Sequence, residues 1–282
     1  MIVPTAVPGA VPALGTVCSL DAELRTILED YSAGQCGAVE LWLGHVERFL
    51  AAEEPETLRG MLADTGMRAV AAAFQGGLMT AEGEAGEIHR TLLGHRLELC
   101  RGLGIPVLVV AGDAFGPLDP AGLSRMAENL AAAARRAAEA GVRLALEFDA
   151  RASFPNNLQS AVALVEQVRH PALGLCLDWH HFTIGPSKEA DLGLLDAEHL
   201  FHVQLSDLAD VPREMAGDAE RILPGEGSSD PSPLLDRLAT IGYRGAVSVE
   251  LMNPALWRVP PRQFGEVAAT ALRRLLGQAE MG

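Results

Sequence analysis

The chain has 282 residues, of which 49% are hydrophobic, and it carries a formal net charge of −15 at pH 7. Such a charge repels phosphate backbones and argues against nucleic acid as a partner. Lys188 is the only lysine and lies in a polar stretch typical of a solvated residue, which argues against a Schiff-base mechanism.

At its start the chain reads MIVPTAVPGAVPALG, which is apolar but has no basic residues and contains three prolines, unlike a signal peptide. No uninterrupted apolar run approaches the roughly 20 residues that span a bilayer. We therefore expect a soluble, cytoplasmic protein that has no membrane partner. The four cysteines are widely spaced and form no CxxC pair, which argues against a structural zinc site and a disulfide framework.

Short apolar, β-rich runs then alternate with longer helical segments along the whole chain. We predict strands at residues 13–18, 37–42, 67–74, 106–111, 142–148, 173–178, 200–205 and 245–251. Eight β/α alternations predict an α/β fold, the (β/α)8 TIM barrel. An open doubly wound sheet is the structural alternative, but no GxGxxG motif follows the first strand. No linker divides the chain, so we expect one domain over residues 1–282.

Polar residues recur at alternate positions of the last four strands. Because side chains alternate between the two faces of a strand, each strand divides into a helix-facing set, which includes Phe201, and a set inside the barrel. The residues assigned to the interior are Arg143, Ala145, Glu147, Gly174, Cys176, Asp178, His202, Gln204, Ala246, Ser248 and Glu250.

Three of these interior residues, Glu147, Asp178 and Glu250, are carboxylates near the strand ends where barrel enzymes have their active sites. Carboxylates so close together repel one another unless they are protonated or neutralised. A divalent cation is the simplest remedy, and Gln204 supplies a neutral fourth oxygen. The alternative is that each carboxylate pairs with an arginine such as Arg221.

The motifs GVRLALEF, LGLCLDWHHF, FHVQLSD, RILPGEG and GYRGAVSVELMNPALWRVPP together resemble the xylose-isomerase-like barrels of sugar isomerases and epimerases. The resemblance is good over roughly 141–261 and is limited to the strand pattern before that. It implies that Glu147, Asp178 and Glu250 bind a metal ion, and it places Gln204 where relatives have a histidine or, in some cases, a glutamine. An all-oxygen ligand set favours Mn²⁺ or Mg²⁺, with Co²⁺ or Zn²⁺ as further options.

The resemblance also implies roles in catalysis for residues around the metal. Glu147 and Glu250 would form an acid/base pair, while His181 of the D-x-x-H motif and Arg221 of RILPGEG would contact the substrate. For His181 and Arg221 the alternatives are a hydrogen-bonded loop histidine and a surface salt bridge. Strand parity and position add three candidates that could line the substrate pocket, namely His202, Glu40 and His45.

The implied reaction is proton transfer between neighbouring carbons of a small sugar, inosose or keto-polyol, through a metal-stabilised enediolate. A lyase of the same fold, similar to a 3-dehydroshikimate dehydratase, is one alternative. A non-catalytic sugar-binding barrel is another, because Gln204 replaces a histidine ligand. A relative of endonuclease IV is disfavoured by the acidic charge and by the lack of histidines after the third and fourth strands. The sequence does not determine the oligomeric state, although a homodimer is compatible with the resemblance.

Overall fold

The computed structural model describes residues 6–278. Eight parallel strands form a closed barrel in the order β1-β10-β7-β6-β5-β4-β3-β2. The short strands β8 and β9 form a separate antiparallel pair. The prediction of a (β/α)8 TIM barrel is therefore confirmed. The strands are β1 (Val11–Gly15), β2 (Ala38–Trp42), β3 (Arg68–Gln75), β4 (Val107–Gly112), β5 (Arg143–Phe148), β6 (Leu173–Asp178), β7 (Leu200–Leu205), β8 (Asp207–Leu208), β9 (Arg221–Ile222) and β10 (Ala246–Val249).

Nine α-helices lie within the described residues, and their ends follow from local chemistry. The side chain of Asp119 accepts a hydrogen bond at the start of α5, and Asn157 forms a capping box at the start of α6. None of the helices described is long and apolar enough to cross a membrane. The helices are α1 (Leu24–Ala33), α2 (Leu43–Leu50), α3 (Pro55–Asp64), α4 (Gly83–Leu103), α5 (Pro120–Glu139), α6 (Leu158–Val168), α7 (Trp179–Ile184), α8 (Ser232–Thr240) and α9 (Pro261–Leu275).

By its internal contacts the chain divides into two compact units. The first holds the described residues up to Val70 and from Val203 onward, and the second is Ala71–His202. The single domain expected over 1–282 stays a prediction. It includes residues 1–5 and 279–282, which lie outside the described part of the chain. The first five residues of MIVPTAVPGAVPALG, the stretch compared with a signal peptide, are among them.

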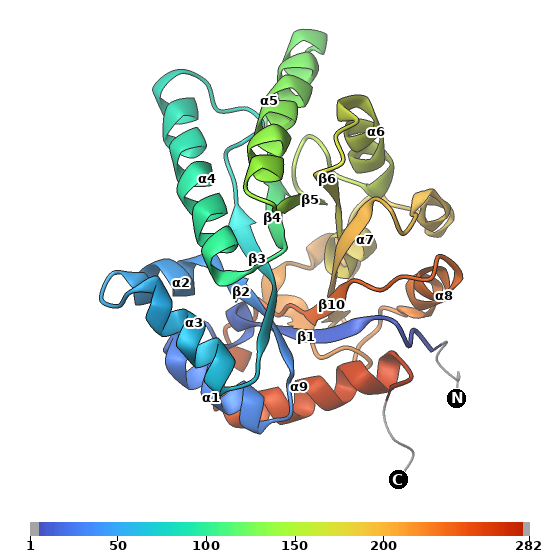
Figure 1. The fold of residues 1–282 in the computed structure, drawn as a ribbon. Helices are drawn as coiled ribbons and strands as arrows, with labels where there is room; N and C mark the ends of the chain where they lie inside the picture. The colour runs from blue at the N-terminus through green and yellow to red at the C-terminus, as the bar shows by residue number, and fades with distance from the viewer. Residues whose placement is uncertain (1–5, 279–282) are drawn as a thin grey trace. The chain divides into compact units, whose positions relative to one another are not determined.

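In the first unit α9, the last helix of the described residues, lies along α1 (Figure 1). The rings of Tyr31 and Phe264 meet in this contact with their centroids 6.0 Å apart. On the strands, Ala13, Ala38 and Ala246 form an apolar cluster with Val70. Small side chains on this face leave space for larger polar residues nearer the carboxyl ends of the strands.

In the second unit the strands β4, β5 and β6 pair in register, and the long helices α4 and α5 run side by side (Figure 1). Ala145 pairs with Gly174 and Glu147 pairs with Cys176, so these four residues share one face. The same register places Glu147 and the end of β6 at one edge of the sheet.

Phe201 was assigned to the helix-facing side of β7, and that assignment is wrong. Its ring packs in an apolar cluster with Ala145 and Cys176, and the guanidinium carbon of Arg143 lies 4.4 Å from the ring centroid. The physical reason is the missing side chain of Gly174, where a Cβ atom would lie 2.7 Å from Phe201 Cε2. A large ring on the neighbouring strand fills the space that glycine leaves.

Two predicted strands are shorter than expected because side chains replace their backbone partners. The run 13–18 leaves the sheet after Gly15 and forms the 3₁₀ helix Thr16–Ser19. The hydroxyl of Thr16 accepts the backbone N–H of Trp42 at 2.8 Å. At the end of β10, the backbone N–H of Leu251 donates to Cys18 Sγ instead of a carbonyl oxygen. Predicted strand 173–178, in contrast, matches β6 at both ends.

Candidate functional site

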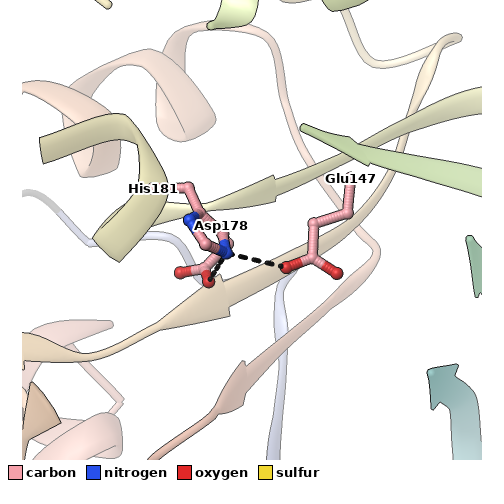
Figure 2. A group of neighbouring side chains, drawn as sticks. All are labelled: Glu147, Asp178 and His181. Carbon is pink, nitrogen blue, oxygen red and sulfur yellow. Dashed lines mark ion pairs between the residues drawn. The ribbon is translucent and has the colours of Figure 1, made fainter. Parts of the chain in front are cut away.

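Three side chains gather at the carboxyl ends of β5 and β6 (Figure 2). Glu147 is the next-to-last residue of β5, Asp178 is the last residue of β6, and His181 lies in the first turn of α7. One donor atom from each lies within 4.8 Å of the others. The structure thus brings together two of the predicted metal ligands and the histidine of the D-x-x-H motif.

The distances within this group suit a cation. His181 Nε2 lies 3.6 Å from Glu147 Oε1 and 3.7 Å from Asp178 Oδ2 (Figure 2). Both are too long for direct hydrogen bonds. Ligand atoms bound to one ion at about 2.1 Å lie roughly 3–3.5 Å from each other. The three groups therefore fit a divalent ion after a small contraction.

Asp178 has two structural roles at the junction of β6 and α7. It is fully buried, and its Oδ1 accepts the backbone N–H of His180 at 2.8 Å as the N-cap of the helix. The helix turn that follows places His181 beside Asp178. The ring of Trp179 stacks on Phe182 at 4.9 Å between centroids and helps to fix this short helix. D-x-x-H is therefore a strand end and a helix start in one motif.

The hydrogen bonds of His181 decide which of its nitrogens carries the proton. The backbone N–H of Ala150 donates to Nδ1 at 3.4 Å, whereas the nearest oxygen of Asp149 is 3.6 Å away and beyond hydrogen-bond range. Neutral His181 therefore has its proton on Nε2, which faces Glu147 and Asp178. In this form it donates to an oxygen, and metal ligation through Nε2 would require the proton to move to Nδ1.

A second polar cluster lies in the other unit and is buried throughout. Gln204 Nε2 donates to Glu40 Oε1 at 2.8 Å and to Glu250 Oε1 at 3.0 Å. The hydroxyl of Ser248 donates to Glu40 Oε2. Arg221 Nη1 donates to Glu250 Oε2 at 3.2 Å. One hydrogen-bonded network therefore joins residues from β2, β7, β9 and β10 with Glu250, which lies just beyond β10.

Arg221 is only 1% exposed, although it was expected to meet the substrate or to form a surface salt bridge. Besides Glu250, its guanidinium contacts Asp218 through an Nε–Oδ1 hydrogen bond of 3.2 Å. Its own carbonyl oxygen accepts from Asn253 Nδ2 at 3.0 Å. A surface salt bridge is therefore the wrong description, because the pair with Glu250 is buried. The substrate contact stays a prediction.

The thiol of Cys18 holds the backbone on both sides of Glu250. It donates to Val249 O at 3.3 Å and accepts from Leu251 N at 3.1 Å. Burial is the main cause that raises the pKa of this thiol well above its usual range, and the nearby carboxylates of Glu250 and Glu40 raise it further. Cys18 is therefore protonated and serves as a hydrogen-bonding group, a role that the sequence did not reveal.

Both other histidines proposed for the pocket are buried. His202 is fully buried in β7, and its contact with a substrate stays a prediction. His45 is 1% exposed, and its ring nitrogens lie 3.2 Å from Thr16 Oγ1 and 3.0 Å from Leu20 O. Its ring also meets Trp42 edge-on. His45 is therefore a packed, hydrogen-bonded residue rather than part of a pocket wall.

Comparison with known proteins identifies relatives along most of the chain. The sequence model of a family described as xylose isomerase-like TIM barrel matches residues 32–275. An inosose isomerase of Halalkalibacterium halodurans is 35% identical over 120 residues, which are 42% of this chain and 43% of that protein. A 3-dehydroshikimate dehydratase of Pseudomonas aeruginosa is 29% identical over 271 residues, which are 92% of this chain and 40% of that protein. The chain thus matches less than half the length of these two curated relatives.

Among solved structures, the crystal structure of an IOLI protein with a bound zinc atom superposes with a TM-score of 0.86. The two chains are 21% identical, and the superposition covers 96% of this chain and 99% of the other. At that identity the likeness establishes the fold.

Proposed function

The chain belongs to the xylose isomerase-like TIM barrel family, and from that premise we propose that it is a divalent-metal-dependent isomerase or epimerase of a small sugar, inosose or related keto-polyol. The observation that supports this proposal most strongly is the group formed by Glu147, Asp178 and His181 at the carboxyl ends of β5 and β6. The names of the inosose isomerase relatives support the sugar-like substrate.

We propose that Glu147 and Asp178 are metal ligands, and that Gln204 and Glu250 complete the set, as strand parity and the family resemblance indicate. A divalent ion bound there would stabilise the negative charge that develops on neighbouring substrate oxygens. Four oxygen ligands favour Mn²⁺ or Mg²⁺. The nearby imidazole of His181 keeps Zn²⁺ and Co²⁺ among the metals to test.

The chain's own residues would move the proton. Glu147 and Glu250 are proposed to remove a proton from one carbon and to return it at the neighbouring carbon. Neutral His181, whose Nδ1 accepts the backbone N–H of Ala150, would donate from Nε2 to a substrate oxygen. Arg221 fixes the carboxylate of Glu250 through its hydrogen bond to Oε2, so that the other oxygen keeps a defined direction.

A dehydratase is the second candidate, because the match with the 3-dehydroshikimate dehydratase extends over 92% of this chain. Such an enzyme would use the same carboxylates and metal, but it would eliminate water. The two reactions differ in product, since elimination yields an ultraviolet-absorbing compound and isomerisation exchanges a substrate proton with solvent.

The deciding experiment loads the purified chain with each of the four metals and offers a panel of ketoses and inososes in D₂O. Proton NMR would follow exchange at the carbon next to the carbonyl. In a parallel sample with 3-dehydroshikimate as substrate, absorbance would follow the product of elimination. Exchange without a rise in absorbance supports the isomerase. Elemental analysis that finds no metal after soaking in Mn²⁺ would favour a non-catalytic sugar-binding barrel instead.

Asp178→Asn is the sharpest variant for this experiment. Asparagine caps a helix as well as aspartate does, so α7 should start as before while the ligand charge is lost. We expect metal affinity and turnover to fall by more than about 100-fold, the upper range for loss of outer-shell partners. Asp191→Asn is the matched control, because Asp191 is a buried aspartate of the same unit that accepts from Gln159. Equal turnover in the two variants contradicts the metal role.

A further inference from the structure

We infer that Glu40 is a positioning residue that orients the amide of Gln204 so that its oxygen, and not its nitrogen, acts as the metal ligand. The inference rests on the proposed function, since it assigns a role toward the proposed metal ion. The observation behind it is the buried hydrogen-bonded network that joins Ser248, Glu40, Gln204 and Glu250.

The chemistry of the partners fixes the orientation of the amide. A glutamine side chain donates only through its nitrogen and accepts through its oxygen, while ionised carboxylates only accept. Gln204 lies between two carboxylate oxygens, one from Glu40 at 2.8 Å and one from Glu250 at 3.0 Å. An amide turned the other way would place oxygen against oxygen on both sides. Both amide protons are therefore committed to carboxylates, and Oε1 is the atom that can bind a cation.

Glu40 is itself held in place. It is 2% exposed, and the hydroxyl of Ser248 donates to the oxygen that does not contact Gln204. Each oxygen of the carboxylate thus accepts a hydrogen bond, which fixes its direction. A group fixed in this way can determine the orientation of its neighbour.

This arrangement explains why a glutamine suits position 204 in this chain. A histidine that binds a metal through one nitrogen has only one remaining N–H group. It cannot donate to both Glu40 and Glu250, so one of these buried acceptors would lose this hydrogen bond. Glutamine at position 204 therefore matches glutamate at position 40, because its amide can donate to Glu40 and to Glu250 at the same time.

The test measures Mn²⁺ affinity of the full, substrate-free chain by the electron paramagnetic resonance signal of free Mn²⁺. Glu40→Met removes one of the two acceptors at similar size, so the amide loses one of the hydrogen bonds that orient it. We expect binding to weaken by about 10–100-fold, as for other outer-shell partners of metal ligands. Asp191→Asn, which changes a buried carboxylate that also accepts from a glutamine amide, should leave the affinity unchanged.

A conservative variant separates orientation from charge. In Glu40→Gln the new amide oxygen can accept from Gln204 while its nitrogen donates to the Ser248 oxygen. We expect this variant to bind Mn²⁺ within about threefold of the wild type. If Glu40 acted by its charge, Glu40→Gln would lose as much affinity as Glu40→Met, and the inference would be overturned.

A double-mutant cycle shows whether Glu40 acts through Gln204. In a Gln204→Ala chain, Glu40→Met should weaken Mn²⁺ binding no further, whereas additive losses contradict the inference. Ser248→Ala covers the case in which Glu40→Met fails to fold, as judged by melting without metal. It removes the second donor to Glu40 and should weaken binding by roughly threefold or more, so wild-type affinity in folded Ser248→Ala argues against the inference.

The outcomes also separate this inference from the proposed function. A wild-type chain that binds no Mn²⁺ overturns both. Tight binding by the wild type together with unchanged binding by Glu40→Met overturns only the role of Glu40. Loss of binding in Glu40→Met with retention in Glu40→Gln supports it, whichever substrate the chain turns over.

Discussion

At the scale of single residues, Glu250 is held at both carboxylate oxygens and at the backbone on both sides. Gln204 and Arg221 each donate to one of its oxygens, and Cys18 bonds to the backbone on either side of it. A base that exchanges a proton with a carbon must keep one direction throughout the reaction. The hydrogen bonds give Glu250 that direction before any substrate binds.

We therefore predict that Glu250→Gln abolishes exchange of solvent deuterium into the substrate. The amide has nearly the same shape but cannot take up a proton, and loss of a general base costs about 10²–10⁴-fold in rate. The measurement is NMR exchange at saturating Mn²⁺, with metal content checked for each sample. Glu226→Gln, on an exposed glutamate of the PGEG segment, is the control. Exchange in Glu250→Gln at the wild-type rate would rule out the base role.

His45 gives a prediction about pH at the same scale. Burial lowers its pKa below the ordinary value of 6.5, so the folded chain resists a proton that the unfolded chain accepts. The stability that neutral His45 contributes is present above pH 6.5 and is lost as the pH falls through the lower folded pKa. Urea titrations should show the free energy of unfolding decreasing over this range. His45→Gln should flatten the curve, and an unchanged slope would contradict the assignment.

The sequence predicted some of these residues and missed others for a physical reason. Alternation along β5 and β6 was enough to place Glu147 and Asp178 at one sheet edge. The hydrogen bond between Glu40 and Gln204 joins positions 164 residues apart. No local pattern carries such a contact, so the sequence did not predict it.

At the scale of elements, the segment after β7 folds around one carboxylate. Asp207 accepts the backbone N–H groups of Leu208, Gly225, Gly227 and Ser229 and the hydroxyl of Ser229, at 2.7–3.0 Å. A Cβ atom at Gly227 would lie 2.2 Å from Leu208 O, so the close approach requires glycine. The PGEG turn is thus fixed by Asp207, the first residue of β8.

Asp207→Asn should destabilise the chain. An amide has one accepting oxygen in place of two, so at least one buried N–H group loses its partner, at a cost of about 1–3 kcal/mol for each. Urea denaturation measures the change. Asp230→Asn is the control, because that exposed side chain caps only Ser232 and should change stability by less than about 1 kcal/mol. Equal stability of the two variants would mean that the turn does not depend on Asp207.

Strand ends were the least predictable feature of the elements. Predicted strand 173–178 is correct at both ends, because the apolar run of β6 stops at Asp178, which caps the next helix. The first and last strands end early, since Thr16 and Cys18 supply side-chain partners where the ladder would continue. The β-rich composition of these runs predicted where the strands lie but not the partner of each N–H group.

At the scale of the whole molecule, the charge of −15 bears on substrate choice. A negative field slows the approach of anions and has little effect on neutral sugars, and low salt strengthens it. We predict that lowering the salt from about 0.5 M to 0.02 M reduces kcat/KM for a ketose phosphate by about tenfold and for the free ketose by less than about twofold. A ketose phosphate that reacts faster at low salt would show that local positive charge outweighs the total.

The thiol of Cys18 also provides an internal reporter of local opening. It is fully buried, protonated and bonded to the backbone around Glu250, so an alkylating reagent reaches it only while those bonds are broken. The rate of its modification, located by mass spectrometry, would measure how often the carboxyl end of β10 opens in the native chain. Opening of the strand end that carries Glu250 can be followed in this way without any substrate or introduced label.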